Sequence, residues 1–171
     1  MTSSLVVGPL RAYRCWHMIW HDDQPVLRSV YYPTIWPAEG PLRATCEKGP
    51  GSLAAWVRGL FSRRAKTQAH PVPTWGCHCG IYGLTHLEGN ELENVPQTSL
   101  RGPDRGVAVL GAVLLWGRVI QHEQGYRAEY ARPVKLLANP SQFNARDTNG
   151  LLNAVAQRYA IQFAASLEEL K

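Results

Sequence analysis

The chain has 171 residues, of which 45% are hydrophobic and 18% are charged, and its formal net charge is +5. This mixture predicts one globular domain with a packed core and excludes a largely disordered chain, which would combine few aromatic residues with high charge. The N-terminus lacks the basic and apolar regions of a secretory signal, and no apolar run is long enough to span a membrane, so we expect a cytoplasmic protein without a membrane partner.

The N-terminal third is predicted to form a β-hairpin. Aromatic and β-branched residues are concentrated in residues 10–20 and 26–35, and residues 21–25 between them have the composition of a turn. Residues 38–51 contain several Pro and Gly and are predicted to form a loop. Cys15 lies in the first strand, and we expect it in the core, because free cysteine is among the most buried residue types.

Residues 52–66 have the pattern of an amphipathic helix. Apolar residues recur at the spacing of one helical face. That face is a candidate surface for docking into a larger assembly. The opposite face is basic, which suits either an anionic partner or a solvated surface. Its candidate partner-binding residues are Arg58, Arg63, Arg64 and Lys66.

A second hairpin is predicted in the C-terminal half. Residues 106–121 and 125–137 have the composition of two long strands joined by a short turn. Gly111 and Gly117 lie on one face of the first of these strands, where the missing side chains permit bending or the close approach of another backbone. We therefore expect the sheet to be strongly curved.

Two segments around this hairpin have helical patterns. Residues 80–87 are predicted to form a short helix, and a longer helix begins at Asp147 or Thr148 and continues to Tyr159. With the strands, these elements predict a single α+β domain over residues 1–171. Its architecture is a strongly curved, mainly antiparallel sheet or half-barrel packed with two or three helices.

The segment with the clearest chemical character is Cys77-His78-Cys79-Gly80. In an extended or turn backbone the side chains of residues i and i+2 point to the same side, so both sulfurs can reach one metal ion while His78 points away. Structural zinc takes four nitrogen or sulfur ligands. Cys46 and His70 lie in the preceding loops, and the sequence predicts a zinc site formed by Cys46, His70, Cys77 and Cys79.

Other interpretations of these cysteines stay open. They can be buried unpaired thiols, or a disulfide or redox pair, although cytoplasmic cysteines are more often free thiols or metal ligands. An enzyme is the main alternative function. In that case either zinc keeps an open position for an activated water, or Cys79 is a nucleophile at the start of the predicted helix. The histidines that could assist such a nucleophile are His70, His78 and His86.

The complete set of four ligands favours a non-catalytic role over an enzyme. We therefore expect a zinc-stabilised binding or adaptor module, and the basic charge favours nucleic acid, a nucleotide or an acidic protein as its partner. Within residues 126–130, Arg127 and Glu129 share one strand face, either as a functional pair or as a solvated one, and Arg118 can join them from the opposing strand. Arg118 and Arg127 are further candidate partner-binding residues. Aromatic residues near the loops are candidate stacking surfaces or core residues: Trp36, Trp75 and Trp116.

Three stretches of the sequence also resemble a known family. They include Gly8-Pro9-Leu10-Arg11, Cys77-His78-Cys79-Gly80-Ile81-Tyr82, and the segments at 115–119 and 125–131. The chain resembles a family of small actinobacterial-type proteins without a known activity, which contain a C-x-C-G-I-Y-A segment and a later L-W-G-x-V…G-Y-R-A-E-Y-A segment. Gly83 stands where that pattern has Ala. Relative to that family, residues 52–67 with their basic amphipathic helix look like an insertion into the domain. The resemblance implies that the four predicted zinc ligands occupy family positions, and it implies no activity.

Overall fold

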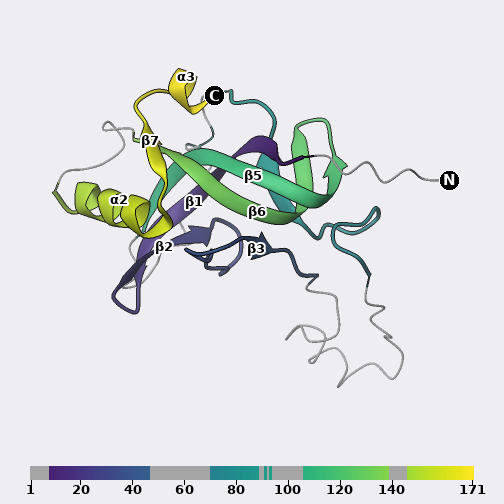
Figure 1. The fold of residues 1–171 in the computed structure, drawn as a ribbon, viewed down its shortest axis with the longest axis horizontal. Helices are drawn as coiled ribbons and strands as arrows, with labels where there is room; N and C mark the ends of the chain where they lie inside the picture. The colour runs from purple at the N-terminus through teal and green to yellow at the C-terminus, as the bar shows by residue number, and fades with distance from the viewer. Residues whose placement is uncertain (1–7, 47–69, 89–90, 92, 94–105, 139–145) are drawn as a thin grey trace.

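The computed structural model describes residues 8–46, 70–88, 91, 93, 106–138 and 146–171, whose arrangement is shown in Figure 1. The helix predicted at 52–66 lies outside these residues, as do its basic side chains Arg58, Arg63, Arg64 and Lys66. The elements in chain order are β1 (Leu10–His21), β2 (Gln24–Ser29), β3 (Leu42–Arg43), β4 (Ile81–Leu84), β5 (Val107–Gln121), β6 (Gly125–Leu137), α2 (Arg146–Tyr159), β7 (Gln162–Ala164) and α3 (Leu167–Leu170).

The first predicted hairpin is confirmed, but its second strand is shorter than predicted. β1 and β2 pair antiparallel around a two-residue turn in which Asp22 and Asp23 both have positive φ, as the tight turns of right-twisted hairpins require. β2 ends at Ser29, and the chain then folds back so that the Ser29 N–H donates to the Thr34 carbonyl at 2.9 Å. This turn falls within the residues that composition alone assigned to a strand.

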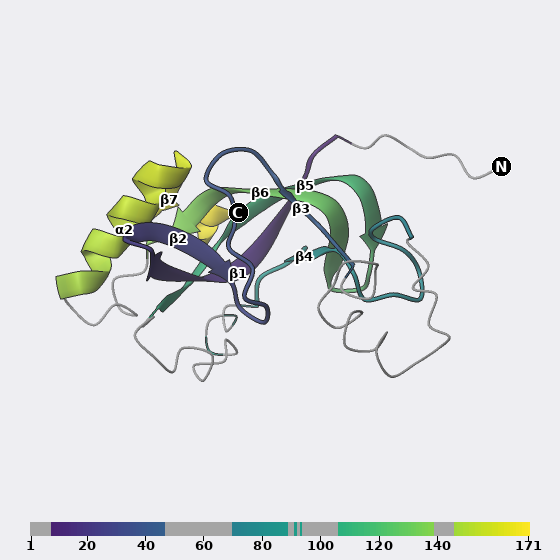
Figure 2. The same ribbon diagram turned by 90° about the horizontal axis from the view of Figure 1, so that it is seen from below.

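The second hairpin, β5–β6, has the predicted bounds to within a residue and bends the sheet. The pairing of β5 with β6 is interrupted at two irregularities, one of which contains Gly117 at a φ of 78°. A Cβ at Gly111 would lie 2.3 Å from the carbonyl oxygen of Lys135, so glycine there permits the close approach of two backbones. Figure 2 shows both long strands curving around the rest of the sheet.

Seven strands of the described residues form one sheet, which is antiparallel except for the pairing of β6 with β7. β1 pairs with β5, β5 with β6, and β6 with β4, and a single residue pair, Tyr13 with Leu84, joins β4 back to β1. The sheet therefore nearly closes on itself without forming a clean barrel. The prediction of a mainly antiparallel sheet is confirmed.

The short helix predicted at 80–87 is wrong, because Ile81–Leu84 is a strand. β4 pairs with the start of β6 from Ile81 opposite Ala128 to Leu84 opposite Gly125. Ile81 and Gly83 face inward while Tyr82 faces outward, which is the two-residue period of a strand. Isoleucine, tyrosine and glycine are all poorer helix formers than alanine, so pairing with β6 decides the conformation.

The main core lies between one face of the sheet and helix α2. Trp16 and Trp36 meet edge to face in it, with their ring centroids 5.3 Å apart, and α2 contributes the buried face that its sequence predicted. The hydroxyl of Tyr159 donates to the Trp36 carbonyl at 2.7 Å and accepts from the Leu27 N–H at 3.0 Å, which ties the helix to β2. Cys15 is partly buried against a smaller second cluster.

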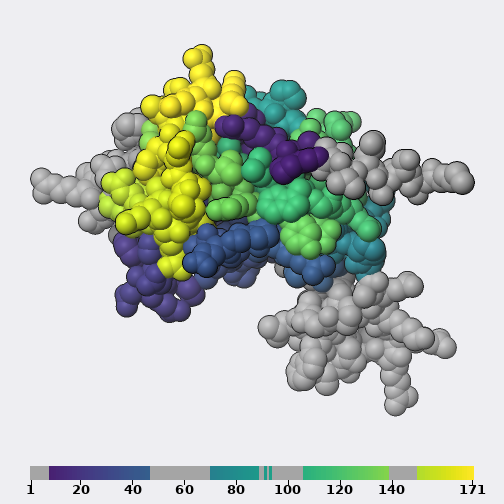
Figure 3. All heavy atoms as spheres, viewed as in Figure 1, coloured from purple at the N-terminus to yellow at the C-terminus, as the bar shows by residue number. Residues whose placement is uncertain are grey.

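Helices contribute less to the packing than the sequence predicted. Within the described residues, α2 and the four-residue α3 are the helices, and neither is long and apolar enough to cross a membrane. In the space-filling view, part of the yellow C-terminal region lies beside the blue residues that follow β2 (Figure 3). Helix α2 itself contacts β1 and β2. Both ribbon views place α2 at the opposite end of the sheet from the loop that precedes β4 (Figures 1 and 2).

Candidate metal centre

The four predicted ligands come together at the end of the sheet away from α2. Cys46 lies just after β3, which pairs with β6 at Ala131 and Tyr130 and so fixes the position of this segment. The other three ligands precede β4. One ligand atom from each of the four residues lies within 4.8 Å of all the others: Cys46, His70, Cys77 and Cys79. These residues therefore lie close enough to bind a metal ion.

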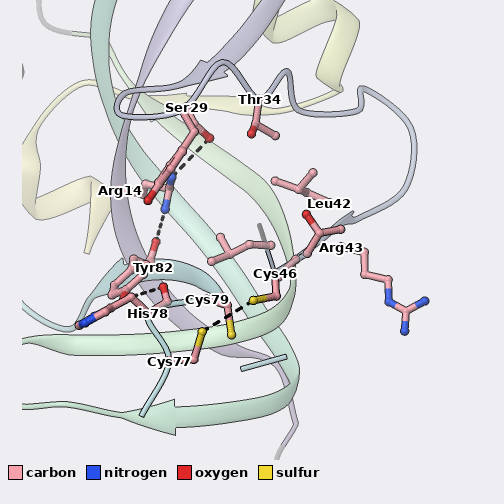
Figure 4. Close-up of a pocket in the computed structure, with 15 residues that line it drawn as sticks. Arg14, Ser29, Thr34, Leu42, Arg43, Cys46, Cys77, His78, Cys79 and Tyr82 are labelled. Carbon is pink, nitrogen blue, oxygen red and sulfur yellow. Dashed lines mark hydrogen bonds between the residues drawn. The ribbon is translucent and has the colours of Figure 1, made fainter. Parts of the chain in front are cut away.

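The geometry of the sulfurs fits a tetrahedral ion. The Sγ atoms of Cys46 and Cys77 are 3.7 Å apart. Two sulfurs bound to one tetrahedral zinc at about 2.3 Å would be about 3.8 Å apart. Figure 4 shows the three sulfurs directed toward one another from two separate segments. His78 contributes no atom to the cluster, as its position between the two cysteines predicted.

Two glycines shape the loop that presents Cys77 and Cys79. Gly76 has a φ of 77° and Gly80 a φ of 119°, both in the region that glycine adopts without strain. The Cys77 N–H closes a turn onto the Thr74 carbonyl at 3.4 Å. A Cβ at Gly80 would lie 3.1 Å from the Cβ of Pro73 and 3.2 Å from that of Arg127. The motif W-G-C-H-C-G is therefore a turn followed directly by strand β4.

The thiols of this loop differ in how readily they ionise. The backbone N–H of Cys79 donates to the Cys77 sulfur and lowers the pKa of that thiol to about 7. Burial, together with the nearby sulfur of Cys77, raises the pKa of the Cys79 thiol above its ordinary value. One thiolate is therefore available near neutral pH before a metal binds, and a bound cation would displace the remaining thiol protons.

The histidine ligand is oriented by a backbone contact. Nδ1 of His70 lies 2.9 Å from the carbonyl oxygen of Pro71, and this hydrogen bond raises the pKa of the imidazole. When Nδ1 donates to the carbonyl, the proton is held there and Nε2 keeps the lone pair that a metal needs. Metal-binding histidines commonly have such a partner for their second nitrogen.

Arg127 lies behind the cysteine loop, and only 4% of its surface is exposed. Its guanidinium donates to the carbonyl oxygens of Cys77 and Cys79, the latter at 3.2 Å, and its Nε donates to His122 at 2.6 Å. It does not pair with Glu129, which instead contacts Arg43 at 3.4 Å. If the site held a divalent cation on three thiolates, its net charge would be negative, and the Arg127 guanidinium behind the loop would offset that charge.

The remaining sequence candidates lie at different depths. Arg118 is exposed on β5, and its backbone N–H donates to Glu129 at 3.4 Å. Trp36 is buried, whereas Trp116 is partly buried and stacks on Tyr130. Trp75 is 74% exposed beside the cysteine loop, with its ring edge toward that of His122.

A pocket of about 210 Å³ separates the cysteine loop from the segments that follow β2 and β3 (Figure 4). The sequence analysis missed it. Arg14 in its wall occupies the same face of β1 as the core residues Ala12, Trp16 and Met18. An arginine among apolar residues on the inward face of a strand is unusual, and this pattern could have indicated the pocket from the sequence. The polar and aromatic residues of the wall also include Ser29, Tyr32, Thr34 and Tyr82.

Comparisons with known proteins add no identity: no family model matches the chain, and no curated protein or solved structure matches it significantly. The resemblance to the actinobacterial-type family therefore stays a prediction.

Proposed function

We propose that the protein is a zinc-stabilised, non-catalytic binding module for single-stranded nucleic acid. The observation that carries the first part is the complete set of four nitrogen and sulfur ligands, whose atoms lie within 4.8 Å of one another. Three cysteines and one histidine are a composition that zinc favours, and four protein ligands leave no position for a reacting water. Zinc here joins the segment after β3 to the loop before β4.

The surface beside the cluster supports nucleic acid as the partner. Trp75 is 74% exposed, and the Tyr82 ring lies stacked on that of His122 with centroids 6.3 Å apart. Exposed aromatic rings with a basic background are the features that bind single-stranded nucleic acid, because every base can stack on them. The formal charge of +5 supplies that background.

The experiment measures zinc and strand binding in the same preparation. Elemental analysis of protein purified without a metal-affinity step should give one zinc per chain. Fluorescence anisotropy with a short single-stranded RNA should show binding at about 50 mM salt that weakens steeply as salt rises. Absence of binding at that salt concentration contradicts the nucleic-acid assignment.

A matched pair of variants tests the stacking surface. Trp75→Ala should weaken strand binding by about tenfold or more, the usual effect of removing one stacked base contact. Trp20→Ala is the control, because Trp20 is also half-exposed but lies near the β1–β2 turn, away from the cysteine loop. Equal effects of the two substitutions would argue against a binding surface at Trp75.

One observation favours an enzyme as the second candidate. The side chains of Cys46, Cys77 and Cys79 border the pocket, so a substrate there would lie beside the metal or a free thiolate. Cys79 does not lie at the start of a helix as predicted, because strand β4 follows it. Cobalt substitution separates the candidates: a spectrum that changes with added anions indicates an open metal position, whereas an invariant four-coordinate spectrum indicates a structural site.

A further inference from the structure

Arg14 holds a positive charge at a place where the described residues provide no counter-ion. It lies in the middle of β1, with its guanidinium 5.4 Å from the centroid of the Trp36 ring. Its terminal nitrogens contact two neutral groups, the Tyr82 carbonyl at 2.6 Å and the Ser29 hydroxyl at 3.4 Å. Its Nε is buried without a hydrogen-bond partner in the described part of the chain.

This environment is costly for a cation. Burial lowers the pKa of Arg14 to about 10. Arg14 is partly buried, and a charge that is withdrawn from water ordinarily has a partner of opposite sign, because the loss of hydration is otherwise uncompensated. The ion pairs identified among the described residues are His21 with Asp22 and Arg43 with Glu129, and neither includes Arg14.

Arg14 and Arg127 have different surroundings. Both arginines contact Tyr82, Arg127 through the ring and Arg14 through the carbonyl oxygen. Arg127 donates to two carbonyl oxygens of the cysteine loop, where a metal bound by three thiolates would supply negative charge. Arg14 lines a pocket that also borders the cysteine loop, and within the described part of the chain no carboxylate pairs with it. An anion that enters the pocket would supply its counter-charge.

The wall of the pocket also contains hydrogen-bond donors besides Arg14. Hydroxyl groups of Ser29, Thr34 and Tyr32 line it with Arg14, and such groups donate hydrogen bonds to phosphate oxygens. Its volume of about 210 Å³ equals that of several water molecules, which suits a phosphate and part of the group attached to it. The ring of Tyr82 connects this wall to the exposed rings of the cysteine loop.

We propose that this pocket binds the terminal phosphate of a nucleic-acid strand, with Arg14 as the residue that neutralises it. The inference rests on the proposed nucleic-acid function and adds the strand end as the recognised feature. A terminal phosphate concentrates more negative charge than an internal diester and has one free side that can enter a hollow. The first bases would then follow over Tyr82 toward Trp75.

The test compares strands that differ only at their ends. Binding to one short RNA is measured with a 5′-phosphate, with a 3′-phosphate and with hydroxyls at both ends, in low salt and with the zinc-loaded protein. One of the phosphorylated strands should bind about tenfold or more tightly than the hydroxyl strand, as expected for a charged hydrogen-bonded contact. Equal affinity for all three strands in the native protein overturns the inference and leaves the proposed function intact.

Two variants with the same change of charge assign the preference to the pocket. Arg14→Gln should abolish the preference while changing the affinity for the hydroxyl strand little. Arg118→Gln, on the exposed face of β5, should lower all three affinities alike and keep the preference. A preference that survives in folded Arg14→Gln contradicts the role of Arg14. If that variant does not fold, Arg14→Lys serves instead, and it should weaken the preference because lysine lacks the planar fork of arginine.

A nucleoside monophosphate distinguishes the two proposals. If the protein binds no strand but a nucleoside 5′-monophosphate raises its melting temperature in an Arg14-dependent manner, the phosphate pocket stands and the strand-binding function fails. If neither ligand binds, both proposals are overturned.

Discussion

At the scale of single residues, the loop that carries Cys77 and Cys79 is held by Arg127, a charged residue that is not itself a metal ligand. Arg127 donates to two carbonyl groups of the loop and so places a cation against the backbone of Cys77 and Cys79. It contacts no ligand atom that a metal would use, so its role is to position the loop and to balance its charge. Groups in this position commonly change metal affinity strongly when they are removed.

We predict that Arg127→Gln lowers the affinity for zinc by about 10- to 100-fold while the protein stays folded. The reason is that the Cys77 and Cys79 carbonyls lose a charged donor and the thiolates lose the nearby cation. Competition with a chromogenic chelator measures the affinity. Arg118→Gln removes the same charge from an exposed position and should change it by less than about threefold. An affinity equal to that of the native protein would show that Arg127 does not act on the metal site.

A second residue gives the protein a pH dependence that does not involve the metal. His17 on β1 is only 1% exposed, and neither ring nitrogen has a hydrogen-bond partner among the described residues. Burial lowers its pKa below 6.5, and the charge of Arg28 on the neighbouring strand β2 lowers it further. The folded protein therefore keeps His17 neutral at a pH where the unfolded chain already binds a proton.

Stability should consequently fall as the pH drops below about 6.5, by at most about 1.4 kcal/mol per pH unit from this group. His17→Leu should remove this part of the dependence and leave stability at pH 7.5 unchanged or higher, because it replaces an unpaired buried polar group by an apolar one. Denaturant titrations of both proteins at pH 7.5 and 5.5 measure the difference, and the metal ligands, common to both, cancel. If both proteins lost the same stability between pH 7.5 and 5.5, His17 would not be the source of this pH dependence.

At the scale of elements, α2 packs on the sheet through its buried apolar face, and the Tyr159 hydroxyl adds two buried hydrogen bonds to this contact. Tyr159→Phe should destabilise the protein by about 1–3 kcal/mol, because the buried Leu27 N–H and Trp36 carbonyl both lose their partner. Chemical denaturation gives the free energy of unfolding. Tyr126→Phe on β6 is the matched control, since no hydrogen bond from its hydroxyl was found within the described residues, and it should cost less than about 0.5 kcal/mol. Equal costs would mean that the two hydrogen bonds contribute little.

The elements that the sequence predicted are those with local signals. Both hairpins and α2 have a clear period in their side chains and turn residues at their ends. Their bounds agree closely with the structure, except that β2 already ends at Ser29. β4 and β3 were not predicted, because they are short and exist through pairing with β6, far away in the chain. Non-local pairing of this kind overrides weak local preference.

The candidate site also has one part that the sequence predicted and one part that it did not. The four ligands were predicted because cysteine and histidine are chemically distinctive and few. The pocket was missed because its wall combines β1, the segments after β2 and β3, and the cysteine loop, which only the folded sheet brings together. Arg127 was chosen for an exposed role, whereas the curvature of β6 turns it under the loop.

At the scale of the whole molecule, the ligands and the core form separate regions. The core lies between α2 and the sheet, and the ligands lie at the other end, on the segments that flank β3 and β4. Metal binding therefore stabilises the loops directly and the core only through β3, β4 and their pairing with β6.

Removal of the metal with a chelator should lower the melting temperature. It should also increase local unfolding more at the end of the sheet that carries the ligands than in the core. Amide hydrogen exchange should accelerate first in residues 42–46 and 70–84, while β1 and β5 stay protected, because local stability follows local contacts. Re-addition of zinc should restore both signals. If hydrogen exchange accelerated equally in β1, β5 and the loops, the ligand region and the core would not be separate units of stability.

The positions of Cys46 and His70 also have a use in protein engineering. These two ligands are the residues on either side of segment 47–69, so a bound ion holds the beginning and the end of that segment at one point. The entropy of closing a loop grows only slowly with its length, so a sequence exchanged between two clamped ends adds little cost to folding. A reporter peptide, an epitope or a second small domain grafted between Cys46 and His70 would thus be presented from a metal-locked base, and the chelator would release it.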